Sequence, residues 1–115
     1  MYIGAHYPLD KTLFETVKNA FQKDKINAIQ IFTKSPRQIN KKSKISIQDI
    51  QKTNTFMNQY NIKLFIHATY VINLCVHPNK NLKNLIEDLH ILEKLDLGIG
   101  LVVHFGYYNN ITEEE

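Results

Sequence analysis

The chain has few of the residues that mark disulfide-rich, fibrous or membrane-spanning proteins. Its 115 residues include one cysteine, no tryptophan, four glycines and three prolines. The single cysteine, Cys75, cannot form an internal disulfide, which suits a reducing compartment, and its expected role is packing. No run approaches the ~18 apolar residues that span a bilayer, and the N-terminus lacks the order of a secretory signal. The sequence predicts a soluble, intracellular protein of the cytoplasm or nucleus, without membrane contact.

The length and charge of the chain limit its domain organisation and its possible partners. At 13.5 kDa, without a linker rich in glycine, proline or serine, residues 1–115 are expected to form a single partial domain with no second domain. The net charge of +3 is unevenly distributed, because the basic segment Thr33–Lys44 contains five cationic side chains and no acidic one. Such a segment can attract phosphate groups. The alternative interpretation is a solvated, lysine-rich loop.

Apolar runs alternate with helical periodicities along the chain. Strands are expected at residues 1–6, 28–32, 64–67 and 99–104. The first helix begins at Asp10 or Thr12, and the second at Ser46, which forms a capping box with Asp49. An interrupted apolar stripe indicates the second helix, and repeated leucines indicate a third that ends near Asp96. The residues are Ile47, Ile50, Phe56, Met57 and Tyr60 for the second helix, and Leu82, Leu85, Ile86, Leu89, Leu92 and Leu95 for the third.

This alternation predicts an α/β fold with parallel strands and right-handed crossovers. A closed eight-stranded barrel needs about 250 residues. The expected fold is therefore the N-terminal part, about four β/α units, of a TIM-type (β/α)8 barrel. Thr112 followed by three glutamates is typical of a helix start, so the chain is expected to stop as its fourth helix begins.

Histidines close three of the four expected strands, at His6, His67 and His104. A single histidine beside apolar residues is structural more often than it is a ligand. The repetition is more informative, because the runs before His67 and His104 have the same arrangement and the carboxyl ends of parallel strands lie at one edge. Two such histidines can share one metal ion, and zinc binds neutral imidazole well.

Four segments resemble a known family in the same order and at similar spacing. They are the opening residues 2–6, the stretch 31–38 (IFTKSPRQ), the stretch 67–74 (HATYVINL) and the strand that ends at His104. These segments resemble the endonuclease IV family of zinc-dependent apurinic/apyrimidinic endonucleases. The resemblance covers nearly all of this chain, but only the N-terminal portion of the family.

The resemblance implies a reaction and a metal. The reaction is hydrolysis of the phosphodiester on the 5′ side of an abasic site in double-stranded DNA. His67 and His104 match ligands of one Zn²⁺ in a cluster of three zinc ions. The remaining ligands of that cluster come from later strands, which this sequence does not contain. No complete catalytic set is therefore expected, and the isolated chain is expected to be truncated and inactive.

The resemblance also implies DNA contacts. Arg37 and Gln38 match a loop that enters DNA at the lesion, and Tyr70 matches a tyrosine beside the metal and the DNA. Lys34, in the same basic segment, is expected to bind DNA as well. Guanidinium groups pair with phosphate and stack on bases, and a phenol offers a stacking face and a hydroxyl donor. His6 and Asn73 receive no firm role.

Two local departures separate the chain from the family pattern. Tyr7–Asp10 replaces a glycine-rich turn, and Phe105-Gly106 replaces proline and glycine, but neither change removes a proposed ligand. One alternative is a half-barrel without catalysis that binds DNA or assembles with itself or a partner through open sheet edges. Another is a sugar isomerase or epimerase with the same barrel. The basic stretch 32–38 favours the endonuclease.

Overall fold

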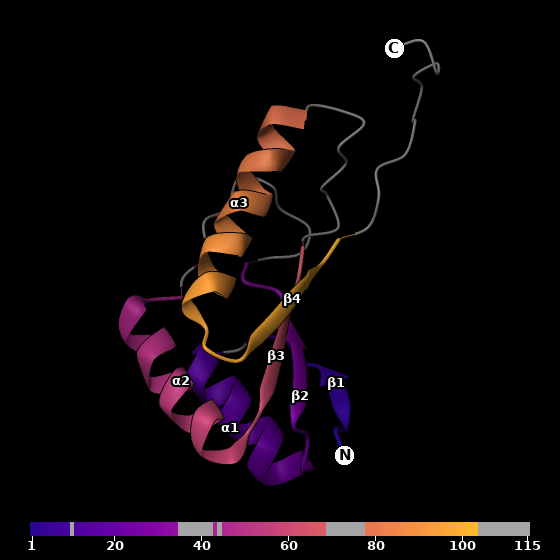
Figure 1. Cartoon of the computed structure of the whole chain (residues 1–115), viewed down its shortest axis with the longest axis vertical. Helices are drawn as coiled ribbons and strands as arrows, with labels where there is room; N and C mark the ends of the chain where they lie inside the picture. The colour runs from indigo at the N-terminus through magenta and orange to yellow at the C-terminus, as the bar shows by residue number, and fades with distance from the viewer. Residues whose placement is uncertain (10, 35–42, 44, 69–77, 104–115) are drawn as a thin grey trace.

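The structure, a computed structural model, describes residues 1–9, 11–34, 43, 45–68 and 78–103, with the backbone alone for 78–81. Strands and helices alternate throughout these residues (Figure 1). The strands are β1 (Gly4–His6), β2 (Ala28–Ile31), β3 (Lys63–His67) and β4 (Gly98–Val102). The helices are α1 (Leu13–Asp24), α2 (Ile47–Tyr60) and α3 (Pro78–Lys94). The four expected strands and the first three expected helices are present within a few residues of their predicted bounds, whereas the helix start expected at Thr112 lies outside the described residues.

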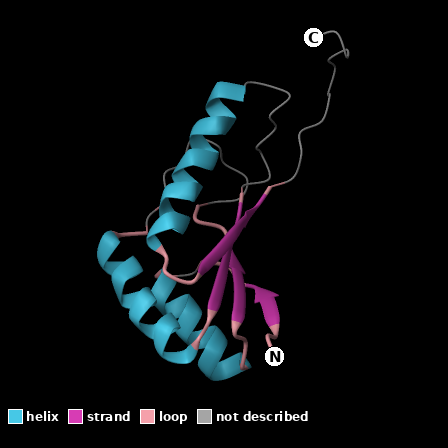
Figure 2. Ribbon diagram, in the orientation of Figure 1, coloured by secondary structure: helices cyan, strands magenta, loops and turns pink. Residues whose placement is uncertain are grey.

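The four strands form one parallel sheet in the order β1-β2-β3-β4, so each strand pairs with its neighbour along the chain. Figure 2 shows the helices gathered on one side of this sheet. The predicted α/β fold with parallel strands is confirmed. Closure of such units into a TIM-type barrel stays a prediction. In the part of the chain described, no helix is long and apolar enough to cross a membrane.

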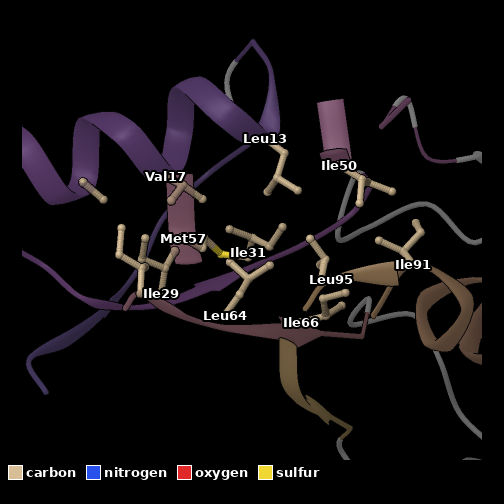
Figure 3. Packing of buried hydrophobic residues seen from close by; sticks show 12 residues of the cluster. Leu13, Val17, Ile29, Ile31, Ile50, Met57, Leu64, Ile66, Ile91 and Leu95 are labelled. Carbon is tan, nitrogen blue, oxygen red and sulfur yellow. The ribbon is translucent and has the colours of Figure 1, made fainter. Parts of the chain in front are cut away.

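The core lies between the sheet and the helices. In β2 and β3 alternate side chains are fully buried, and the register pairs Ile29 with Leu64 and Ile31 with Ile66. Because side chains alternate across a strand, these four residues line the face that the helices cover. Figure 3 shows this face meeting side chains from all three helices. The helical members of the cluster are Leu13, Val17, Ala20, Ile50, Met57 and Ile91, and Leu95 joins them directly after α3.

Local signals in the sequence set the helix starts. Thr12 accepts a hydrogen bond from the Glu15 amide, and Ser46 accepts one from the Asp49 amide, so both predicted caps are confirmed. The third helix begins at Pro78, earlier than the leucine pattern indicated. Proline suits the first turn of a helix because that position has no intrahelical N–H bond to lose.

Not every residue of the apolar stripes is buried. Ile47 is 57% exposed, and Leu82, Ile86 and Leu89 on α3 are 50%, 43% and 49% exposed. The periodicity located these helices correctly, but it did not identify which positions are covered. The three α3 residues follow one another at helical spacing, so they form an apolar stripe that no described element covers.

The carboxylate of Asp49 joins the first turns of two helices. Asp49 lies in the first turn of α2, yet its side chain accepts hydrogen bonds from the amides of Leu13 and Phe14 at the start of α1. These N–O distances are 2.8 and 2.9 Å. With Thr12 bonded to the Glu15 amide, three of the N–H groups that a helix start leaves unpaired have acceptors.

Candidate functional site

Two of the expected site histidines lie at the carboxyl ends of their strands. His6 is the last residue of β1 and His67 the last residue of β3. Phe32, which follows β2, contacts both imidazoles. Its ring centroid lies 4.8 Å from that of His6 and 5.0 Å from that of His67. The structure therefore brings the ends of the first three strands together around one aromatic ring.

A backbone carbonyl orients the imidazole ring of His67. Its side chain is buried, and its Nδ1 atom is hydrogen-bonded to the backbone carbonyl of Ala68. A carbonyl oxygen only accepts, so Nδ1 of His67 donates in this hydrogen bond. A hydrogen bond from the second ring nitrogen is the usual way in which proteins orient a histidine ligand. Zinc binding by His67 stays a prediction.

In His6, by contrast, Nδ1 accepts a hydrogen bond. The side-chain amide of Gln30 lies 3.1 Å from His6 Nδ1 and donates to it, so the ring proton is on Nε2. Partial removal from water lowers the pKa of His6, and the neighbouring His67 lowers it further. His6, Gln30 and Phe65 help to line a shallow cavity of about 320 Å³. His6 is thus a neutral hydrogen-bond donor at this edge.

The second expected zinc ligand, His104, lies outside the described residues. The register pairs His67 with Val102, and the Ala68 amide donates to the Val102 carbonyl at 2.8 Å. The carboxyl ends of β3 and β4 are therefore adjacent, and His104 follows Val102 by two positions in the sequence. Among the described residues, no group of three or more side chains could hold a metal ion.

Most of the expected DNA contacts cannot be located. Arg37, Gln38 and Tyr70 lie outside the described residues, as do Asn73 and Cys75, and their roles stay predictions. Lys34 is described, and its side chain is only 1% exposed. Its ammonium lies 3.0 Å from Glu87 Oε1 and 3.0 Å from Asn84 Oδ1, both on α3. A direct phosphate contact by Lys34 stays a prediction, and this geometry favours a structural role instead.

Asp88, a buried acid next to the Lys34–Glu87 pair, was not predicted from the sequence. The Thr33 hydroxyl donates to Asp88 Oδ1, and Asp88 Oδ2 has no hydrogen-bond partner among the residues that the structure describes. Burial raises the pKa of Asp88, and Glu87 raises it too, whereas Thr33 and Lys34 oppose the shift. The sequence contains a signal for this residue. Asp88 falls at helical spacing between Leu85 and Leu92, on a face that is otherwise apolar.

Replacing Asp88 with asparagine should flatten the pH dependence of stability. The folded-state pKa lies above the ordinary value, so above about pH 4 the folded chain binds more protons than the unfolded chain. The free energy of unfolding therefore falls as pH rises through this range, and Asp88→Asn removes that contribution. Urea denaturation at several pH values measures the slope. An unchanged slope in Asp88→Asn would contradict the assignment, and Asp96→Asn, at an exposed aspartate, is the control.

A cavity of about 640 Å³ is lined by none of the expected site residues. It lies between the N-terminal turns of α1 and α2, and three lysines help to line it: Lys11, Lys18 and Lys52. Helix starts and lysines together suit an anion. Here, however, the Asp49 carboxylate already accepts hydrogen bonds from two of the backbone amides that an anion would need. We therefore assign this cavity no function.

Comparison with known proteins adds no family assignment. The sequence matches no protein-family model, and no curated protein matches it significantly. The resemblance to the endonuclease IV family therefore rests on four sequence segments, of which 31–38 and 67–74 lie partly outside the described residues. The described geometry adds one buried histidine, oriented by the Ala68 carbonyl, at the edge where parallel strands end.

Proposed function

We propose that this chain is the N-terminal part of a zinc-dependent endonuclease that cuts double-stranded DNA on the 5′ side of abasic sites. In this proposal its four parallel strands belong to a TIM-type barrel of the endonuclease IV family. One observation supports it above all. The Nδ1 atom of His67 is held by Ala68, so that Nε2 can bind zinc at the carboxyl end of a strand adjacent to β4.

Each proposed site residue has a role that suits its chemistry. His67 Nε2 and His104 would hold one Zn²⁺, which when bound lowers the pKa of a coordinated water and stabilises charge on a phosphate. Arg37 and Gln38 would contact the DNA at the lesion, and Tyr70 would lie beside the metal and the DNA. His6, whose pKa is lowered, stays neutral and offers an N–H group at the same edge.

Zinc content tests this proposal most directly. His67→Ala should lower zinc affinity roughly tenfold or more, because the site then loses one of its two proposed ligands. His90→Ala is the matched control, since His90 lies on α3 with a side chain that is 68% exposed. Competition with a chromophoric chelator measures the affinities. Equal zinc affinities of the His67→Ala and His90→Ala variants would show that His67 is not a zinc ligand.

Nicking of a duplex that carries one abasic site is the companion assay. Zinc-dependent nicking by the purified chain, abolished in His67→Ala, would support both the proposed zinc site and the proposed reaction. An intact duplex of the same sequence controls for nonspecific cleavage. Zinc binding without nicking would support the proposed pair of zinc ligands, with the other ligands of the catalytic cluster outside this sequence.

One observation favours a second candidate, a half-barrel that assembles rather than cuts. The exposed stripe of Leu82, Ile86 and Leu89 is uncovered, and within the described ranges β1 and β4 each pair on one side only. Apolar stripes and open strand edges promote association. Self-association in light scattering, together with zinc-independent DNA binding, would favour this candidate over the endonuclease.

A further inference from the structure

One carboxylate oxygen on α3 holds residues from both ends of the basic segment. Glu87 Oε1 accepts a hydrogen bond from Lys34 Nζ at 3.0 Å and another from the Ser43 amide at 3.0 Å. Residues 35–42, which lie between these two, are outside the described residues. Lys34 and Ser43 are therefore fixed to the same atom of a helix more than forty positions further along the chain.

Neighbouring contacts reinforce this arrangement. Asn84, one helical turn before Glu87, accepts a second hydrogen bond from Lys34 at 3.0 Å. Thr33 donates to Asp88, the residue after Glu87. The Lys34 side chain is 1% exposed and that of Glu87 is 35% exposed, so this ion pair is better shielded than a surface pair. Hydrogen bonds between charged partners in such a setting are among the stronger ones in proteins.

We propose that Glu87 is a positioning residue, which clamps both ends of the basic segment Thr33–Lys44 to α3. Its carboxylate fixes where the chain leaves β2 at Lys34 and where it returns at Ser43. A segment with fixed ends loses less conformational entropy when it binds a partner. The clamp stands on the described contacts alone. Its consequence for DNA rests on the proposed function, because Arg37 and Gln38 belong to this segment.

The clamp also gives Lys34 a defined role. Its charge is neutralised by Glu87 within the protein. Lys34 therefore contributes to DNA binding by holding the segment, and not by replacing a counterion on a phosphate. Its removal should change affinity without changing the salt dependence of binding.

Trypsin cleavage of the full chain tests the clamp without DNA. Trypsin cuts after Arg37, Lys41 and Lys42, and Glu87→Ala should increase cleavage at these sites roughly tenfold because the segment loses its shared acceptor. Glu87→Gln retains a side-chain carbonyl oxygen and should fall between Glu87→Ala and wild type. Glu93→Ala, which removes a carboxylate that is 81% exposed on the same helix, should cleave at the wild-type rate.

The cleavage pattern separates a clamp from general destabilisation. The clamp predicts an increase confined to the basic segment, whereas loosening of the whole fold would raise cleavage after lysines of α1 and α2 equally. A uniform increase would overturn the proposal, and so would a wild-type rate in Glu87→Ala. Circular dichroism melting of each variant gives the global stability for this comparison.

A double-mutant cycle with abasic duplex DNA tests the functional consequence. Arg37→Ala should weaken binding in the wild-type background and weaken it less in Glu87→Ala, since the loop is then no longer held. Equal effects of Arg37→Ala in both backgrounds would overturn the link between the clamp and DNA. If Arg37→Ala has no effect in either background while cleavage still rises only in the segment, the clamp stands and the proposed DNA contact fails.

Discussion

Replacing Asp49 with alanine should lower the free energy of unfolding by about 2–4 kcal/mol. The variant loses two hydrogen bonds between a carboxylate and the amides of Leu13 and Phe14, at 2.8 and 2.9 Å. It also loses a negative charge from the first turns of two helices, where the helix dipoles favour it. The cost is large because two amides at the start of α1 are left without their acceptors in a partly buried site.

Urea denaturation measures this change, and two further variants identify its cause. Asp49→Asn retains one carbonyl oxygen and should lose about half as much stability as Asp49→Ala. Glu15→Ala removes an exposed carboxylate from the first turn of α1, where it contributes through the dipole alone. Its effect should stay below about 1 kcal/mol. Equal effects of Asp49→Ala and Glu15→Ala would show that the link between the helices contributes little.

Two glycines in β4 should respond to alanine with opposite signs. A Cβ atom at Gly98 would lie 2.8 Å from Leu92 Cδ1, 3.0 Å from the Leu92 carbonyl oxygen and 3.1 Å from Leu95 Cβ. The leucine tip can rotate away, but the carbonyl oxygen belongs to the last turns of α3 and cannot. Gly98→Ala should therefore force α3 away from the strand and destabilise the fold by about 2–3 kcal/mol.

Gly100 is the matched control in the same strand. Apart from its chain neighbours, no atom of the described residues lies within 4 Å of a Cβ built at this position, and its backbone does not have a positive φ. Gly100→Ala should stabilise the protein by about 0.4–1 kcal/mol, because alanine restricts the unfolded chain more than glycine does. Thermal melting of both variants measures the pair. Similar shifts in melting temperature would contradict the contacts at Gly98.

The secondary structure could be predicted because its signals are local. The apolar runs before His67 and Val103 identify strands by composition and length. Thr12 and Ser46 lie three residues before an acidic side chain, and this spacing marks a helix start. Strands that alternate with helices leave few topologies other than a parallel sheet. Local signals of this kind need no knowledge of which distant residues meet.

The contacts that hold the elements together could not be predicted, because they join residues far apart in the sequence. Asp49 appeared as part of its own helix cap, and its contact with Leu13, 36 positions away, depends on how α1 and α2 pack. Gly98 and Gly100 are indistinguishable in the sequence, since only the approach of α3 separates them. The same applies to Leu82 and Leu85, of which one is exposed and the other buried.

Some features of the candidate site could be predicted from the sequence and others could not. Strand order and composition predicted that His6 and His67 lie at carboxyl ends of strands, and both do. The hydrogen-bonding roles of their Nδ1 atoms depend on partners that no spacing rule identifies, the Ala68 carbonyl and the Gln30 amide. Lys34 was grouped with its basic neighbours because charge is visible in a sequence. Its partner Glu87, 53 positions away, is not.

The order of the strands also bears on how the protein can fold during synthesis. Because β1, β2, β3 and β4 pair in the order in which they are made, each new strand meets an edge that has already left the ribosome. Sequence separations between paired strands stay short, which favours fast folding for a parallel sheet. The contacts of Asp49 and Glu87 come later, each when a following helix emerges. Folding can therefore proceed from the N-terminus, one strand and helix at a time.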